Sequence, residues 1–220
     1  MSDICWCPDS RHLYLVREDE RLLRDFWVIN SLDDRPSLTT YRYEFPGDKN
    51  VTQNELVIVD VIGHTVKKTD ISKWPDQYIN PLCVTKDSKY LFFERTKRTW
   101  DEVDLCSVNL STMEVKEIIH EVDKPYRDPH ARSVAILNDG TGWGHYYHYD
   151  GNGKLKNVMT SGEWVAGQIA SIDTLGRTVY LYGYGREKDI DPSYYMLYKV
   201  HIDREGVTPL STEDGQHQVK

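Results

Sequence analysis

The sequence predicts an all-β protein built from repeated strand units, and two features of the chain lead to this prediction. The aromatic residues comprise 15 Tyr and 6 Trp against only 4 Phe among 220 residues, and amphipathic rings suit a pleated, half-buried strand. Apolar residues with helical spacing are nearly absent, and the best helical candidate, residues 18–24, reads better as a polar hairpin. The length is sufficient for one large all-β domain or for two small ones, and size alone does not choose between them.

A repeated segment indicates how the strands are organised. Residues 8–15, 86–93 and 175–182 each consist of a polar turn followed by a β-rich run. Asp and Ser side chains can bond to their own backbone and close such a turn, so each copy is expected to mark the same hairpin corner. Ser10 and Ser88 are 78 residues apart, and Ser88 and Gly176 are 88 residues apart. With one degenerate copy inside each interval, the period is about 39 to 44 residues, which matches the blades of a β-propeller.

The remaining strands are expected from apolar runs and from apolar alternation between these corners. Residues 55–61 and 133–137 read as the degenerate copies, the second ending at the turn of Asn138 to Gly140. The next strand of each unit is expected at residues 24–30, 102–109, 145–150 and 195–203, and outer strands at 114–119 and 154–160. The predicted fold is therefore an all-β, β-propeller fragment of about four to five four-stranded antiparallel blades, with residues 1–220 forming one partial propeller domain.

Three segments were considered as sites of chemistry. Thr160-Ser161-Gly162 does not fit the G-x-S-x-G pattern of a nucleophile elbow and lies at a hairpin end. His145 and His148 are three residues apart in a strand and point to opposite faces, which argues against a shared metal ion. Residues 150–153 look like part of a calcium loop but lack its Glu, and they suit a hairpin turn. We therefore expect no catalytic residue, no metal site and no cofactor in this chain.

Charge and hydropathy exclude two classes of partner. The formal net charge of −8 and the absence of a basic stripe argue against a nucleic acid partner. The longest apolar stretches, such as residues 56–62, fall far short of the roughly 20 residues that cross a bilayer. The acidic first residues do not resemble a signal peptide.

The four cysteines do not show the paired spacing of a zinc site. Cys5 and Cys7 are expected to be small apolar residues on one strand face. The sequence leaves open whether Cys83 and Cys106 form a disulfide.

Two charged loops are candidates for contact with a substrate or partner. The first covers residues 94–102 and includes Arg95 and Arg98, although an ordinary solvated hairpin is the alternative interpretation. The second contains Arg127 and His130 beside two prolines. We expect Arg95, Arg98 and Arg127 to face a substrate.

Several stretches resemble one known family. Trp143-Gly144-His145-Tyr146-Tyr147, followed by residues 154–157 and by Thr160-Ser161-Gly162-Glu163-Trp164, is similar to the propeller of bacterial dipeptidyl peptidase IV-type prolyl oligopeptidases. The similarity extends over essentially all 220 residues, through residues 6–10, 25–30, 41–47, 102–106, 198–200 and 212–217.

The resemblance implies a role within a larger enzyme. In this family an eight-bladed propeller caps an α/β-hydrolase domain whose Ser-Asp-His triad removes dipeptides or tripeptides from peptide N-termini. The present chain resembles the middle-to-late blades, and it matches neither the hydrolase domain nor the paired glutamates that bind the substrate's amine. It also departs from the family pattern between Asn138 and Trp143, where a further strand is usual.

These features lead to a functional expectation. Both ends of the chain fall inside strand patterns, so we expect a piece of a periplasmic or extracellular peptidase. The piece would gate and position peptide substrates for the parent α/β-hydrolase domain, and its exposed blade faces would favour self-association into a homo-oligomer. The alternative is a free-standing propeller that serves as a protein- or glycan-binding scaffold, with exposed Tyr and Trp as anchors.

Overall fold

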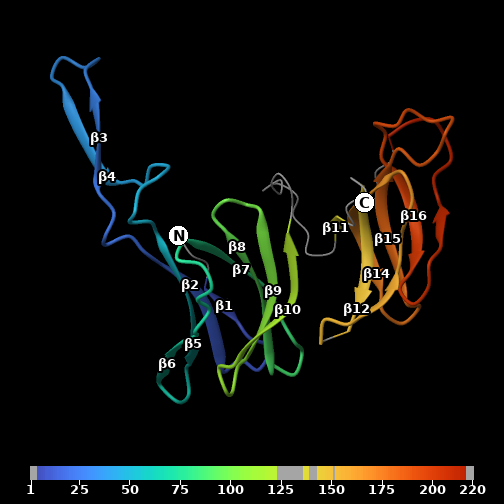
Figure 1. Cartoon of the computed structure of the whole chain (residues 1–220), viewed down its shortest axis with the longest axis horizontal. Helices are drawn as coiled ribbons and strands as arrows, with labels where there is room; N and C mark the ends of the chain where they lie inside the picture. Colours follow the sequence, from blue (N-terminus) through green and yellow to red (C-terminus); the bar gives the residue numbers. More distant parts are fainter. Residues whose placement is uncertain (1–3, 123–135, 139–142, 151, 217–220) are drawn as a thin grey trace. The chain divides into compact units, whose positions relative to one another are not determined.

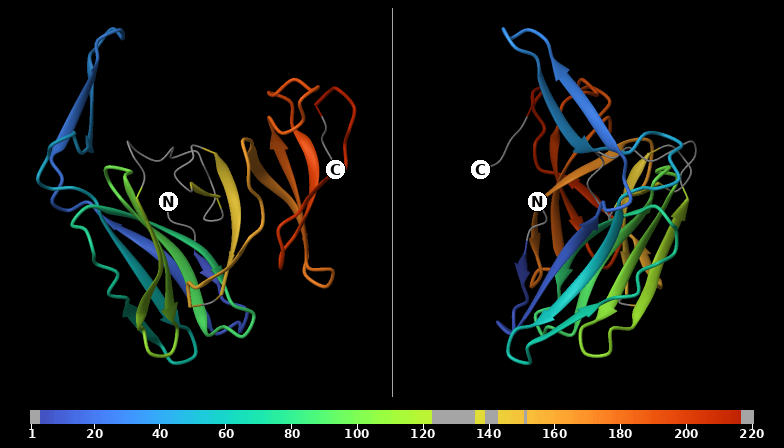
Figure 2. Two further views of the ribbon diagram at one scale, coloured as in Figure 1. Left: turned by 45° about the vertical axis from the view of Figure 1, so that its right-hand side comes forward. Right: turned by 90° about the vertical axis from the view of Figure 1, so that its left-hand side faces the viewer.

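The computed structural model describes residues 4–122, 136–138, 143–150 and 152–216. These residues form β-strands joined by turns (Figures 1 and 2). No helix long and apolar enough to span a membrane occurs among them. The chain divides into two compact units, residues 1–128 and 129–220, which are described separately.

The first unit contains two four-stranded antiparallel sheets. In the first sheet the strands β1 (Cys5–Trp6), β2 (His12–Asp19), β5 (Gln53–Asp60) and β6 (Thr65–Lys68) are adjacent in that order. In the second, β7 (Gln77–Val84), β8 (Tyr90–Lys97), β9 (Glu102–Asn109) and β10 (Val115–Val122) are adjacent in chain order. Leu56 and Ile58 of the first sheet share one core with Leu91 and Phe93 of the second. The two sheets are therefore packed together by apolar burial.

The second unit repeats this arrangement. It contains a sheet of β11 (Ile136–Asn138), β12 (Gly144–Tyr149) and β13 (Leu155–Val158). A second sheet is formed by β14 (Val165–Asp173), β15 (Thr178–Tyr184), β16 (Met196–His201) and β17 (Val207–Pro209). Buried residues alternate with less buried ones along β16, which is the period-two pattern of a strand. The all-β fold of successive antiparallel sheets is thus confirmed. Residues 139–142, where the sequence departs from the family pattern, lie outside the described residues.

The three repeated segments occupy equivalent turns, as predicted. They connect β1 to β2, β7 to β8, and β14 to β15. Ser10, Ser88 and Arg177 have left-handed backbones there, with φ of 54°, 53° and 50°. In each turn an Asp carboxylate accepts backbone N–H bonds: Asp9 from Arg11, Asp87 from Lys89, and Asp173 from Gly176. In the third copy the left-handed residue is Arg177 rather than Gly176, to which the repeat spacing was counted.

The expectation that residues 24–30 form the next strand of a blade is wrong. These residues form β3 (Asp25–Asn30), which pairs with β4 (Ser37–Arg42) in a separate two-stranded sheet (Figure 1). The strand that follows β2 in its sheet is β5, so residues 55–61 are not a copy of the corner strand from another blade. Both segments contain a run of four apolar residues, and such a run alone does not say which strands pair. We call residues 25–42 the inserted hairpin.

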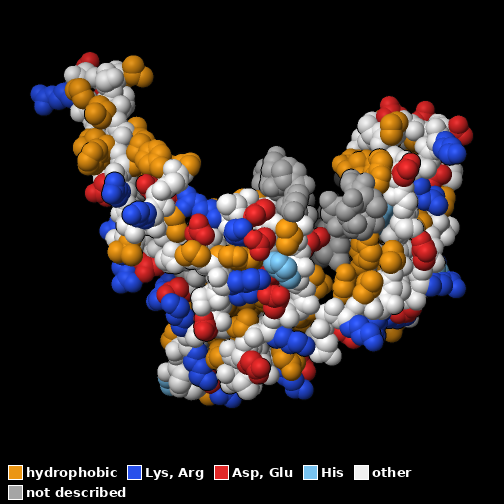
Figure 3. Space-filling view, viewed as in Figure 1, with side chains coloured by type: hydrophobic (Ala, Val, Ile, Leu, Met, Phe, Trp, Pro, Cys, Tyr) orange, Lys and Arg blue, Asp and Glu red, His pale blue; other side chains and the backbone are white. Residues whose placement is uncertain are grey.

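The inserted hairpin has two different faces. On one face, Phe26 contacts the rings of Tyr41, Tyr43 and Phe45, with centroids 5.4 to 5.5 Å apart. On the other, Trp27 is 63% exposed, and the directly paired Ile29 and Leu38 are exposed as well. Figure 3 shows hydrophobic side chains along the length of this hairpin. An isolated two-stranded sheet is only marginally stable in water, so the aromatic cluster supplies much of its internal packing.

The cysteines are all free thiols. Cys83 lies on β7 and Cys106 on β9, with β8 between them. Two strand spacings amount to about 9 to 10 Å, which exceeds the Cα separation of about 7 Å that a disulfide can span. The disulfide that the sequence left open is therefore excluded in this fold. Burial raises the pKa of the Cys106 thiol to about 11, which makes this thiol unreactive at neutral pH.

Candidate functional site

Arg95 belongs to a buried ion pair that joins two strands. Arg95 on β8 is the direct cross-strand partner of Asp104 on β9. Its Nη2 and Nε donate to Asp104 Oδ2 at 2.7 and 3.0 Å, and its Nη1 donates to the carbonyl of Ile71 at 2.9 Å. Arg95 is 6% exposed and Asp104 is fully buried. The guanidinium therefore links β8 to β9 and also holds the segment around Ile71, which leads into β7.

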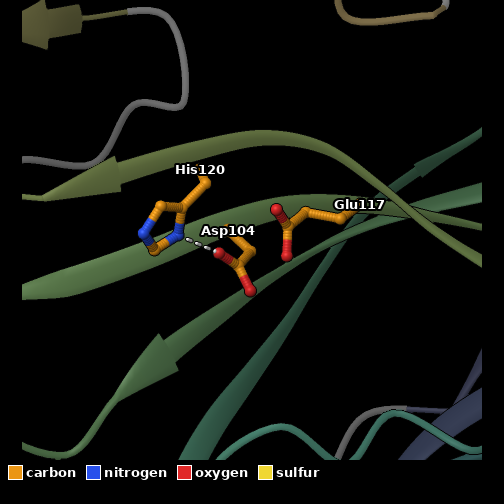
Figure 4. Close-up of side chains that lie close together, drawn as sticks. All are labelled: Asp104, Glu117 and His120. Atoms are coloured by element: carbon orange, nitrogen blue, oxygen red, sulfur yellow. Dashed lines mark hydrogen bonds and ion pairs between the residues drawn. The ribbon is translucent and has the colours of Figure 1, made fainter.

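Three further side chains surround the same carboxylate. The ammonium of Lys73 donates to both oxygens of Asp104 and to Glu117, each at 2.9 Å. The imidazole Nδ1 of His120 lies 2.6 Å from Asp104 Oδ1. Figure 4 shows Asp104 between His120 and Glu117, all three on the paired strands β9 and β10. We call Lys73, Arg95, Asp104, Glu117 and His120 the ion cluster.

The ion cluster lowers the pKa of its central group, Asp104. Burial on its own would raise the pKa of Asp104, but hydrogen bonds from Lys73, His120 and Arg95 outweigh it and hold that pKa below its usual range. The pKa of Lys73 is raised: burial opposes the rise, and its bonds to Asp104 and Glu117 overcome that effect. Asp104 is therefore a carboxylate at neutral pH.

Asp104, Glu117 and His120 also have the chemistry of metal ligands. One ligand atom from each lies within 4.8 Å of the others. However, the ammonium of Lys73 already bonds to both carboxylates, and the guanidinium of Arg95 bonds to Asp104. A divalent ion would have to displace a lysine from a partly buried position and would be repelled by the neighbouring arginine. The arrangement therefore fits an internal salt-bridge network better than a metal centre.

Arg98 lies in the turn between β8 and β9, where its environment differs from that of Arg95. Its guanidinium is 3.6 Å from Glu44, in the segment that follows the inserted hairpin. Its backbone N–H donates to the carbonyl of Asp76. Lys97 beside it pairs with Asp101 at 3.2 Å and Glu102 at 2.6 Å. Arg127 lies outside the described residues. Contact of Arg95, Arg98 and Arg127 with a substrate stays a prediction.

Sequence reasoning missed an aromatic pair at this turn. The indole of Trp100 stacks on the phenol ring of Tyr78, the second residue of β7, with centroids 5.4 Å apart and an interplanar angle of 30°. The available signal was the single Trp among the charged residues of positions 94–102. We call Tyr78 and Trp100 the aromatic stack.

The motif residues of the second unit serve its packing. The two ring nitrogens of buried His145 lie 3.2 Å from Thr160 Oγ1 and 2.8 Å from the carbonyl of Gly162. The indole N–H of Trp164 donates to the carbonyl of Ser161 at 2.7 Å. The chain then continues into β14 rather than into a helix. Thr160-Ser161-Gly162 is thus part of a structural turn.

The turn at residues 150–153 is also structural. Asp150 Oδ1 accepts the backbone N–H bonds of Asn152 and Lys154 at 2.9 and 3.0 Å. These bonds hold the connection between β12 and β13. The carboxylate is therefore used by the hairpin, as the sequence indicated.

Comparison with known proteins identifies the fold. The whole chain, residues 1–220, matches the family model described as dipeptidyl peptidase IV (DPP IV) N-terminal region. Dipeptidyl peptidase 4 of Porphyromonas gingivalis superposes with a TM-score of 0.80 at 20% identity, over 97% of this chain and 31% of that one. A putative dipeptidyl aminopeptidase IV of Bacteroides ovatus superposes with a TM-score of 0.68 at 17% identity, over 89% of this chain and 31% of that one. The chain thus spans about a third of the length of these structures. Because the family model matches all of residues 1–220, the chain belongs to the dipeptidyl peptidase IV N-terminal region family.

Proposed function

We propose that this chain is the propeller segment of a DPP IV-like serine exopeptidase, where it admits and positions peptides for a hydrolase domain elsewhere in the parent protein. The observation that carries the proposal is the family match over all 220 residues. A propeller above a hydrolase site would exclude folded proteins while short peptides reach the nucleophile. Contacts remote from the scissile bond can then orient the peptide for reaction.

The described geometry is consistent with a non-catalytic role. Within the described part of the chain, His145 and Asp150 bond to backbone or hydroxyl groups, and Asp104 is neutralised by Lys73 and Arg95. The proposal therefore assigns bond cleavage to the rest of the parent protein. We also propose a periplasmic or extracellular location for that protein, on the family resemblance.

A hydrolysis assay tests whether bond cleavage belongs to the rest of the parent protein. The full-length protein should release the chromophore from a Gly-Pro chromogenic amide, and a serine-directed inhibitor should abolish the release. The 220-residue chain should show no turnover in the same assay. Inhibitor-sensitive turnover by the chain alone would contradict the proposal. A full-length protein without any peptidase activity would favour the binding-scaffold alternative.

We further propose that the protein self-associates through the inserted hairpin. Trp27, Ile29 and Leu38 place apolar surface on one face of a two-stranded sheet whose other face carries the aromatic cluster around Phe26. Burial of this face against a second copy would remove the apolar surface from water. The open edges of the hairpin would add backbone hydrogen bonds.

A further inference from the structure

A polar cavity lies at one end of the first sheet. Its volume is about 480 Å³, within the range of about 300 to 1,000 Å³ that is typical of small-molecule sites. Its wall is formed by the last residue of β2, by residues 53–55 at the start of β5, by residues 68–72, and by Trp74 and Gln77. The fold therefore brings separate segments of the first unit together around one space.

Two side-chain amides in the wall have bonded donors and free acceptors. Gln53 Nε2 donates to the carbonyl of Pro75 and Asn54 Nδ2 donates to that of Gln77, each at 2.9 Å. Because only the nitrogen of an amide can donate to a carbonyl, these bonds fix the orientation of both amides. Neither Gln53 Oε1 nor Asn54 Oδ1 has a hydrogen-bond partner among the described residues. The wall therefore offers two free hydrogen-bond acceptors.

Asp70 and Thr69 add further unsatisfied oxygens to the wall. Asp70 accepts bonds from the hydroxyl and the backbone N–H of Ser72 at 2.6 and 3.3 Å, both through Oδ1. These bonds hold the pKa of Asp70 below its usual range, so it is a carboxylate at neutral pH. Thr69 is fully buried, and within the described part of the chain its Oγ1 has no hydrogen-bond partner. Buried polar groups are rarely left unpaired, so this wall suits a ligand with several hydrogen-bond donors.

The charges around the cavity argue against an ionic ligand. The ammonium of Lys73 and the guanidinium of Arg95 lie 4.7 and 5.7 Å from the ring centre of Trp74, so a cation would meet like charges beside this wall. An anion would meet the carboxylate of Asp70. An apolar ligand would leave the free amide oxygens without partners. A neutral compound with several hydroxyl groups meets all three conditions, because hydroxyl groups donate to these oxygens and carry no charge.

We propose that this cavity binds a neutral polyhydroxyl compound of the size of a monosaccharide. Hydroxyl groups of the ligand donate to Asp70 and to the amide oxygens of Gln53 and Asn54. The indole of Trp74, which also lines the cavity, offers an apolar surface to the carbon atoms of the ligand. The inference goes beyond the proposed function and does not depend on it, because no part of it involves a peptide or its cleavage.

Calorimetric titration of the full-length protein with glucose, galactose, mannose and N-acetylglucosamine tests the site. At least one of these sugars should bind with a dissociation constant of about 1 mM or below, whereas ethylammonium and acetate ions should not bind. Asp70→Asn should raise the dissociation constant of that sugar about tenfold, because it replaces a charge-assisted hydrogen bond by a neutral one. Thr69→Val should raise it about fivefold and leave the thermal unfolding midpoint unchanged, because the hydroxyl has no bond to lose in the free protein.

Asp191→Asn is the matched control. Asp191 is exposed and accepts bonds from the backbone N–H and the hydroxyl of Ser193 at 2.9 and 2.7 Å, as Asp70 does from Ser72, but it belongs to the second unit. Its substitution should leave the affinity for the sugar unchanged. Absence of binding by all four sugars would overturn the inference. So would equal affinities of the unsubstituted protein and Asp70→Asn, an equal loss in Asp191→Asn, or binding of either ion.

Discussion

Replacement of Asp104 by Asn should destabilise the first unit by about 3 to 5 kcal/mol, because it leaves the buried Arg95 without its countercharge. Asp104 is fully buried and accepts bonds from Lys73, Arg95 and His120. Asparagine keeps the shape of the side chain but cannot neutralise the two cations. The denaturant midpoint of the chain should fall accordingly, with the slope of the transition unchanged.

Glu117→Gln is the control for this substitution. Glu117 bonds to the same lysine, but its side chain is 44% exposed, so water can replace the lost bond. Its cost should stay below about 1 kcal/mol. Equal losses in the two variants would show that burial of the Arg95–Asp104 pair does not govern the stability of this unit.

The pH dependence of the free energy of unfolding gives a second measurement on Asp104→Asn. A carboxyl whose pKa is lowered in the folded state contributes stability above its unfolded pKa of about 4, and this contribution is lost as the pH falls through the folded pKa. The unsubstituted chain should therefore lose more stability between about pH 5 and pH 2 than Asp104→Asn does.

Truncation of Trp164 to Ala should cost the second unit about 3 to 5 kcal/mol. Trp164 is 3% exposed and its ring lies 5.7 Å from that of His145 and 5.3 Å from that of Tyr198, centroid to centroid. It also packs against bare backbone, since a Cβ on Gly183 would lie 2.6 Å from the indole. The cavity left by Ala cannot be filled by these fixed neighbours. Thermal unfolding followed by near-ultraviolet circular dichroism measures the loss.

Trp27→Ala is the matched control for Trp164→Ala and also tests the inserted hairpin. Trp27 is 63% exposed, so its removal should change the unfolding midpoint little. If the hairpin mediates self-association, the molar mass by light scattering should fall in Trp27→Ala and stay unchanged in a variant of another exposed residue, Leu175→Ala. An unchanged mass in both variants would contradict the proposed interface.

Local chemistry explains which parts of the fold were predictable. The turns at Asp9, Asp87 and Asp173 were recognised because a carboxylate that bonds to backbone two or three residues ahead leaves a short sequence pattern. The strands that follow these turns were recognised from their alternation.

Strand pairing was not predictable in the same way. The inserted hairpin and β5 carry equally good strand patterns, and only tertiary contacts decide that β5 pairs with β2.

The candidate site was predicted only in part, because its contacts join residues distant in sequence. Arg95 was identified as notable, but its partners Ile71 and Asp104 come from another segment and another strand. The contact of Trp100 with Tyr78 likewise depends on the register between β7 and β8. The sequence around Arg95 does not indicate its contacts with Ile71 and Asp104, and the sequence around Trp100 does not indicate its contact with Tyr78.

The gating role is tested most directly by comparing substrates of different size with the full-length protein. The same Gly-Pro N-terminus is presented once on a short peptide and once on a stably folded protein, and release of the dipeptide is measured by mass spectrometry. A propeller that gates the hydrolase site predicts rapid release from the peptide and none from the folded protein. Equal rates of release from both would contradict the gating role proposed for this chain.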